Sequence, residues 1–181
     1  MPDFDYRELK LEEAIEYYLC TEGGYIKGDP TKYNREVALD VDTLISFIKS
    51  TQPKSWEKYQ VIYGVNSEKA FIDRFCKEVR QVGLLKALRQ GITDRGIRFR
   101  LVYWKPETNI NEETVRLYEQ NILHCTRQLH YSLSNENSID MVLFINGIPV
   151  VTMELKNQFT GQTLEDAMDQ YRTKRSPADP I

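Results

Sequence analysis

Two apolar segments joined by Asn146-Gly147 constrain the fold of this chain more than any other feature. The run from residue 138 to residue 157 reads SIDMVLFINGIPVVTMELKN, and its only charged residues are Asp140, Glu154 and Lys156. Continuous apolar segments of this kind are typical of strands covered on both faces, and Asn-Gly is a strong hairpin signal. Ionised side chains rarely enter such surroundings without a partner or a metal. The run therefore predicts a central hairpin with a charged site at its open end.

The remaining patterns place helices mainly before this hairpin. Apolar residues at helical spacing predict helices over residues 5–20, 40–51, 67–90 (with a break at Gly83) and 112–120, and a last helix over 164–175 capped by Thr163. Residues 97–104 and 123–131 read as further strands. The 181 residues, 41% apolar and 28% charged, fit one ordinary globular domain. We expect a single α/β domain over residues 1–181, with a central mixed sheet flanked by helices.

The register of the hairpin decides whether its two acids meet. A strict two-residue turn pairs Ile145 with Ile148 and sets Asp140 opposite Met153, which leaves Asp140 and Glu154 on opposite faces. A three-residue loop with a glycine bulge instead sets Asp140 opposite Glu154. We predict the three-residue loop or an equivalent bulge. Acids on opposite faces would contradict a shared metal site.

With the acids together, the hairpin predicts metal-dependent hydrolysis of a phosphodiester. Asp140 and Glu154 would supply the hard oxygen ligands that Mg²⁺ prefers, helped by the carbonyl of Leu155. Such a metal activates a bound water and stabilises charge on the phosphate. Lys156 would orient that water or stabilise the transition state. Spacing alone also allows a plain salt bridge between Asp140 and Lys156 on an edge strand.

Asp140 together with Glu154-Leu155-Lys156 resembles the PD-(D/E)xK nuclease motif. The surrounding segments are similar to the N-terminal nuclease domain of type I restriction enzyme R subunits. These segments are GY (24–25), GDP (28–30), FIKSTQP (47–53), ENSID (136–140), ELKN (154–157) and TGQT (160–163). The resemblance covers nearly the whole chain, and its last two segments are the most specific.

The resemblance implies a restriction-endonuclease-like core that cleaves double-stranded DNA. It implies Mg²⁺ as cofactor, with Mn²⁺ as a substitute, and the methyltransferase and specificity subunits as partners. In that family ATP is used by motor domains that follow the nuclease domain. This chain has no GxxxxGK[ST] phosphate loop, so we expect it to be an N-terminal fragment whose motor domains are absent.

Several further residues are accessory candidates. Related nucleases often carry a Q-x-x-x-Y pattern after the E-x-K strand, and Gln170 matches its first position although position 174 is lysine. A first-helix acid that completes the metal shell would be Glu16 or Glu12, although a solvated helix face is the commoner place for such acids. A basic cluster that could hold DNA, or simply end a solvated helix, consists of Arg172, Lys174 and Arg175.

Net charge, cysteine content and the lengths of the apolar runs indicate how the domain would reach DNA and where in the cell it would work. The formal net charge of −3 is unusual for a free-standing DNA binder, so we expect other subunits to deliver the domain to DNA. The three cysteines form no CxxC pair, and no apolar run is long enough to cross a membrane, so we expect a cytoplasmic location. Two alternatives stay open: a non-catalytic docking module within the same complex, and an independent repair or junction nuclease, which should be more basic.

Overall fold

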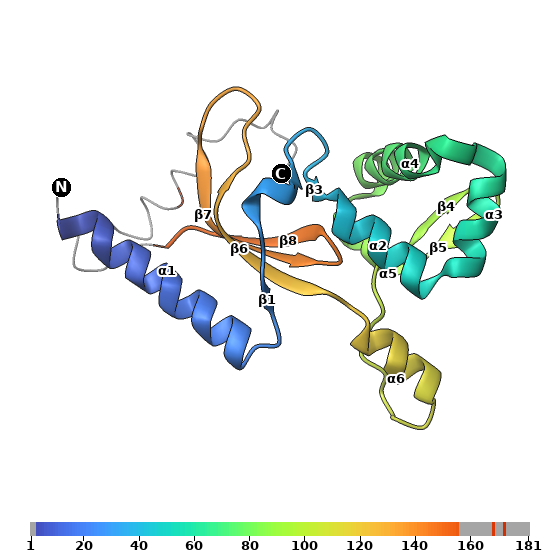
Figure 1. The fold of residues 1–181 in the computed structure, drawn as a ribbon, viewed down its shortest axis with the longest axis horizontal. Coiled ribbons are helices and arrows are strands. Elements are labelled where there is room, and N and C mark those ends of the chain that lie inside the picture. The colour runs from blue at the N-terminus through green and yellow to red at the C-terminus, as the bar shows by residue number, and fades with distance from the viewer. Residues whose placement is uncertain (1–2, 156–167, 169–171, 173–181) are drawn as a thin grey trace. The chain divides into compact units, whose positions relative to one another are not determined.

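The computed structural model describes residues 3–155 together with Met168 and Arg172 (Figure 1). These residues form two compact units. The first, here called the sheet unit, takes its described residues from 1–39, 123–144 and 148–181. The second, here called the helical unit, consists of residues 40–122 and 145–147. A single domain over 1–181 stays a prediction. Of the predicted last helix over 164–175, only Met168 and Arg172 are described, and its Thr163 cap lies outside the described residues.

The sheet unit is built on a four-stranded mixed sheet with the strand order β1-β6-β7-β8. Its elements are α1 (Asp3–Thr21), β1 (Ile26–Lys27), η1 (Pro30–Lys32), β2 (Tyr33–Asn34), β6 (Leu123–His130), β7 (Ser138–Ile145) and β8 (Ile148–Met153). Strand β1 runs parallel to β6, with Ile26 beside His124 and Lys27 beside Cys125. This parallel pair, joined to the β7–β8 hairpin, confirms the predicted α/β class with a mixed sheet.

The core of the unit lies around β6 and β7, and α1 packs against β1 and β6 (Figure 1). Aromatic and aliphatic side chains from β6, β7 and the β2 region make up the core: Tyr33, Ala38, Leu129, Tyr131, Ile139, Val142 and Phe144. Tyr33 meets Phe144 edge to face, with ring centroids 6.1 Å apart. In β7 the apolar residues Ile139, Met141, Val142 and Phe144 are all buried, as the apolar run predicts.

Two helices and a strand of the helical unit, α3, α4 and β5, contribute the rings of an aromatic cluster. Its elements are α2 (Val41–Thr51), α3 (Pro53–Tyr63), η2 (Gly64–Asn66), α4 (Ser67–Val82), α5 (Leu84–Gln90), β4 (Ile92–Asp94), β5 (Ile97–Phe99) and α6 (Glu112–Glu119). Strand β3 (Leu39–Asp40), which pairs with β2, leads into α2. At the centre of the cluster Phe71 and Phe99 meet edge to face, with ring centroids 5.2 Å apart. Each such pair adds about 1 kcal/mol beyond the apolar area that it buries.

Local signals explain most of these boundaries. The Asp40 side chain caps α2 by accepting from the Thr43 amide at 3.0 Å, and α2 ends two residues before Pro53. Gly83 separates α4 from α5 as predicted. Helix α6 begins after its Asn111 cap, also as predicted.

Two predictions about this region were incomplete. Helix α3 was not predicted, because it buries only Trp56 and Tyr59 and shows no continuous apolar stripe. The strand predicted over 97–104 ends at Phe99 and pairs with β4 in a separate two-stranded sheet. Leu101 and Val102 are both buried, so the alternation that a half-buried strand needs stops there.

No helix in the described part of the chain is long and apolar enough to cross a membrane.

Candidate functional site

A tight turn closes the hairpin that carries the predicted acids. Asn146 and Gly147 alone separate β7 from β8, and both have positive φ, 51° and 80°. Two left-handed residues in succession make a type I′ turn, so the predicted three-residue loop was wrong. The alternative of an equivalent bulge elsewhere in the hairpin stays a prediction. The reason for the two-residue turn lies in the Asn146 side chain, which is fully buried. It donates to the Leu101 carbonyl at 2.9 Å and accepts from the Ile122 amide at 2.7 Å. A longer loop would release these bonds.

The open end of the hairpin brings the chain after Glu154 to Asp140. Strand β8 ends at Met153, so strand alternation no longer fixes the side of Glu154 or Leu155. The Leu155 backbone amide donates to Asp140 Oδ2 at 2.7 Å. Asp140, Glu154 and Leu155 are all half-buried. The backbone that follows Glu154 is therefore hydrogen-bonded to the Asp140 carboxylate, a contact that strand pairing alone does not predict. The sharing of one face by the two carboxylates stays a prediction.

Four of the predicted site residues lie outside the described residues: Lys156, Gln170, Lys174 and Arg175. Arg172 is described, and it is exposed. The roles assigned to these five residues stay predictions.

The two acids of α1 are buried rather than solvated. Glu12 is 2% exposed and Glu16 is 9% exposed, so the interpretation of a solvated helix face was wrong. Glu16 Oε2 lies 3.0 Å from Lys27 Nζ and 3.3 Å from Arg127 Nε. Glu12 Oε1 accepts from Gln128 Nε2 at 2.8 Å. Each acid is thus held against the sheet by a specific polar contact, as buried carboxylates require.

A bulge in β6 makes these contacts with α1 possible. Gln128 has a φ of 48° within the strand, a left-handed conformation that is uncommon for a residue other than glycine. In a regular strand Arg127 and Gln128 would point to opposite faces. Here both reach acids of α1. Gln128 was not predicted from the sequence as a residue of the site. The available signal was its place as the last of three consecutive polar residues, Thr126, Arg127 and Gln128, inside an otherwise partly apolar strand.

The acids at the open end suit a hard cation in their chemistry. In the described part of the chain no three side chains of His, Cys, Asp or Glu gather at one point. The donor set there consists of the carboxylates of Asp140 and Glu154, with the Leu155 carbonyl nearby in sequence. Carboxylate and carbonyl oxygens are the ligands that Mg²⁺ and Mn²⁺ take. Glu16 suits that role less well, because two cationic side chains already hold its carboxylate.

Two of the cysteines, Cys76 and Cys125, have raised pKa values. Burial, together with the neighbouring Cys20, raises the pKa of Cys125 to about 12. Burial also raises the pKa of the Cys76 thiol. A reactive cysteine needs a lowered pKa, so chemistry through these two thiols is disfavoured.

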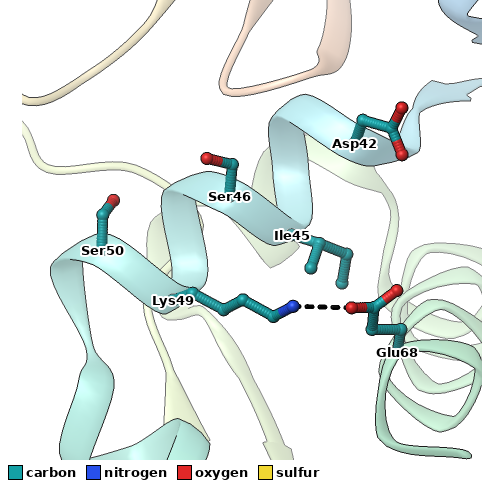
Figure 2. A pocket seen from close by; sticks show the side chains of 6 residues that line it. All are labelled: Asp42, Ile45, Ser46, Lys49, Ser50 and Glu68. Carbon is teal, nitrogen blue, oxygen red and sulfur yellow. Dashed lines mark hydrogen bonds and ion pairs between the residues drawn. The ribbon is translucent and has the colours of Figure 1, made fainter.

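A separate hollow of about 520 Å³ lies in the helical unit beside α2 (Figure 2). It is lined by Asp42, Ile45, Ser46, Lys49, Ser50 and Glu68. Lys49 Nζ lies 2.6 Å from Glu68 Oε1, so its charge is already balanced, and Asp42 leaves the lining net negative. Such a surface repels a phosphate backbone. The hollow is therefore a poor site for DNA.

Comparison with known proteins adds one match. The family model described as "Type I restriction enzyme R protein N terminus" matches residues 45–180, which is well over half of the chain. No curated protein and no solved structure matches the chain. The matched range includes the whole β7–β8 hairpin and both of its acids.

Proposed function

Because the chain belongs to the family of type I restriction enzyme R protein N-terminal regions, we propose that it is a Mg²⁺-dependent endonuclease domain that hydrolyses phosphodiester bonds of double-stranded DNA. The observation that carries this proposal is the hydrogen bond of 2.7 Å between the Leu155 amide and Asp140 Oδ2. It ties the acid of β7 to the backbone of the Glu154-Leu155-Lys156 segment. The family match supports the assignment of these charged residues to a nuclease site.

The proposed roles follow from the chemistry of each side chain. Asp140 and Glu154 would hold the cation, which when bound supplies an activated water and stabilises charge on the phosphate. The Leu155 amide fixes one oxygen of Asp140, so that carboxylate is oriented before any cation binds. Lys156 would donate to the attacking water or to the phosphate oxygens. Gln170 and the basic cluster of Arg172, Lys174 and Arg175 are candidates for contact with DNA.

The charge balance supports delivery to DNA by partners. The chain is acidic overall, with a formal net charge of −3, which is unusual for a protein that binds DNA by itself. We propose that the methyltransferase and specificity subunits bring the domain to DNA. ATP would act only in motor domains of the complete subunit.

Cleavage by the assembled restriction enzyme tests the proposed roles. Asp140→Asn and Lys156→Ala should each reduce the cleavage rate by about 100-fold or more, since each removes a group that acts on the transition state. DNA binding and ATP hydrolysis by the assembly should stay at the wild-type level. Rates of cleavage of a plasmid that carries the recognition site measure the first effect, and filter binding and phosphate release measure the others.

The matched control is Asp73→Asn, which makes the same chemical change on the exposed surface of α4. It should cut DNA at the wild-type rate. Wild-type cleavage by Asp140→Asn would refute the catalytic proposal and favour a docking role for the domain.

A further inference from the structure

We propose that Gln128 is a positioning residue for the acidic site: its side-chain amide links Glu12 of α1 to Ser138 of β7 and thereby fixes the strand that carries Asp140. The proposal rests on the proposed function, because it assigns Gln128 to the cation site suggested there. Gln128 is not part of the E-x-K motif.

The amide of Gln128 is held at both of its ends. Its Nε2 donates to Glu12 Oε1 at 2.8 Å, and its Oε1 accepts from Ser138 Oγ at 3.1 Å. A glutamine side chain has one donating end and one accepting end, so these two partners leave a single orientation for it. Glu12 is 2% exposed, so the contact lies in surroundings where a polar bond is stronger than in water.

The backbone at Gln128 indicates that its side chain is the reason for the bulge. A φ of 48° is adopted easily by glycine, and asparagine is the usual alternative. A glutamine at this position adopts an unfavourable backbone conformation, and the bulge directs its side-chain amide toward α1. Strain of this kind persists where the surrounding contacts hold it, and it is often found at functional sites.

Ser138, which donates to Gln128, lies on the same strand as Asp140. Ser138 and Asp140 are two residues apart, the spacing at which a strand presents both side chains to one face. Both are half-buried, whereas Ile139 between them is fully buried. Gln128 therefore fixes the start of β7 on the side of the sheet that Asp140 occupies. Glu16, which is held by two cations, takes no part in the described link.

Calorimetric titration of the 181-residue chain with Mn²⁺ tests this role. Gln128→Gly removes the amide and its two hydrogen bonds but suits the left-handed backbone, so the relaxed backbone should offset part of the lost stability and the variant should stay folded, which its thermal unfolding checks. Its Mn²⁺ affinity should fall by roughly 10-fold, the lower end of the cost of losing an outer-shell contact, because Gln128 acts through Ser138 and does not touch Asp140 itself. Ser138→Ala should weaken Mn²⁺ binding in the same direction.

The double variant Gln128→Gly with Ser138→Ala separates a shared link from two independent effects. If both residues act through one link, the double variant should bind Mn²⁺ about as well as Gln128→Gly alone. The matched control is Ala38→Gly, which places glycine at another left-handed position of the sheet unit, with a φ of 55°, and should keep wild-type affinity.

The outcomes distinguish this inference from the proposed function. Wild-type Mn²⁺ affinity in Gln128→Gly, or additive losses in the double variant, would overturn the role of Gln128. If Asp140→Asn abolishes binding in the same series, the proposed function would stand nevertheless. A wild-type chain that binds no Mn²⁺ would overturn both.

Discussion

A single carboxylate, Asp94, joins two tyrosines in the helical unit. Its Oδ2 accepts from the hydroxyl of Tyr59 at 2.8 Å and from that of Tyr63 at 2.7 Å. Burial raises the pKa of Asp94, but the two hydrogen bonds and the nearby Arg74 and Arg95 outweigh it, so the pKa lies below its usual value of 3.8. Burial and the contact with Asp94 raise the pKa of Tyr59, so this tyrosine stays a neutral donor.

This lowered pKa predicts how stability depends on pH. Since the folded state binds the Asp94 proton less tightly than the unfolded chain, ionised Asp94 stabilises the fold above pH 3.8, and this contribution is lost as the pH falls through the folded value. Asp94→Asn should lower stability at pH 7 and make its loss in acid shallower. Urea unfolding between pH 7 and pH 2 measures both effects. The exposed Asp73→Asn should leave the curve almost unchanged, and an unchanged slope in Asp94→Asn would contradict the assignment.

At the scale of elements, two hairpins of the same turn type differ in their surroundings. Gly147 in the β7–β8 turn has a φ of 80°, and Gly96 in the β4–β5 turn has a φ of 78°. A Cβ at Gly147 would lie 2.3 Å from the Asp40 carbonyl oxygen and 2.8 Å from the Leu44 amide nitrogen. A Cβ at Gly96 would meet nothing within 4 Å. The first turn is enclosed, and the second is open.

The pair gives a matched test of that enclosure. Gly96→Ala should cost about 1 kcal/mol of unfolding free energy, the backbone strain alone. Gly147→Ala should cost about 3 kcal/mol or more, because the backbone of α2 must also move. Chemical denaturation of the two variants measures the difference. Equal losses would show that the β7–β8 turn is not confined by α2.

The elements also show which structure could be predicted from the sequence. Caps and glycine breaks are local signals, so α2, α6 and the boundary between α4 and α5 were predicted correctly. The type of the hairpin turn was not, because it depends on Asn146 bonds to residues 101 and 122, far away in the sequence. The bulge at Gln128 likewise involves α1, through its contact with the buried Glu12, and Glu16 is held by Lys27 and Arg127. Contacts of this kind are set by tertiary packing and leave little trace in local propensity.

At the scale of the whole molecule, the β7–β8 hairpin contributes residues to both units. The strands on both sides of the turn belong to the sheet unit, whereas residues 145–147 belong to the helical unit. The Asn146 side chain bonds to Leu101, Asn121 and Ile122 within that unit. The helical unit is therefore complete only when the hairpin has formed, and we expect both units to unfold in one transition.

Asn146→Ala tests this dependence. It removes three hydrogen bonds from a fully buried side chain and places alanine at a φ of 51°, so a loss of about 3 kcal/mol or more is expected. Both tryptophans, Trp56 and Trp104, lie in the helical unit, so their fluorescence follows that unit, whereas circular dichroism follows both. The two signals should shift together to lower urea. Separate transitions would show that the units fold independently.

The enclosed hairpin turn also determines where this chain tolerates added sequence. Loop tips with small polar residues are the usual places for epitope tags, reporter domains or new termini, and Asn146-Gly147 looks like such a tip in the sequence. Because this turn is buried, we expect it not to tolerate an insertion, which would displace the Asn146 side chain from its hydrogen bonds to the backbone of residues 101 and 122. The turn at Arg95-Gly96, which is exposed, is the better place to open the chain.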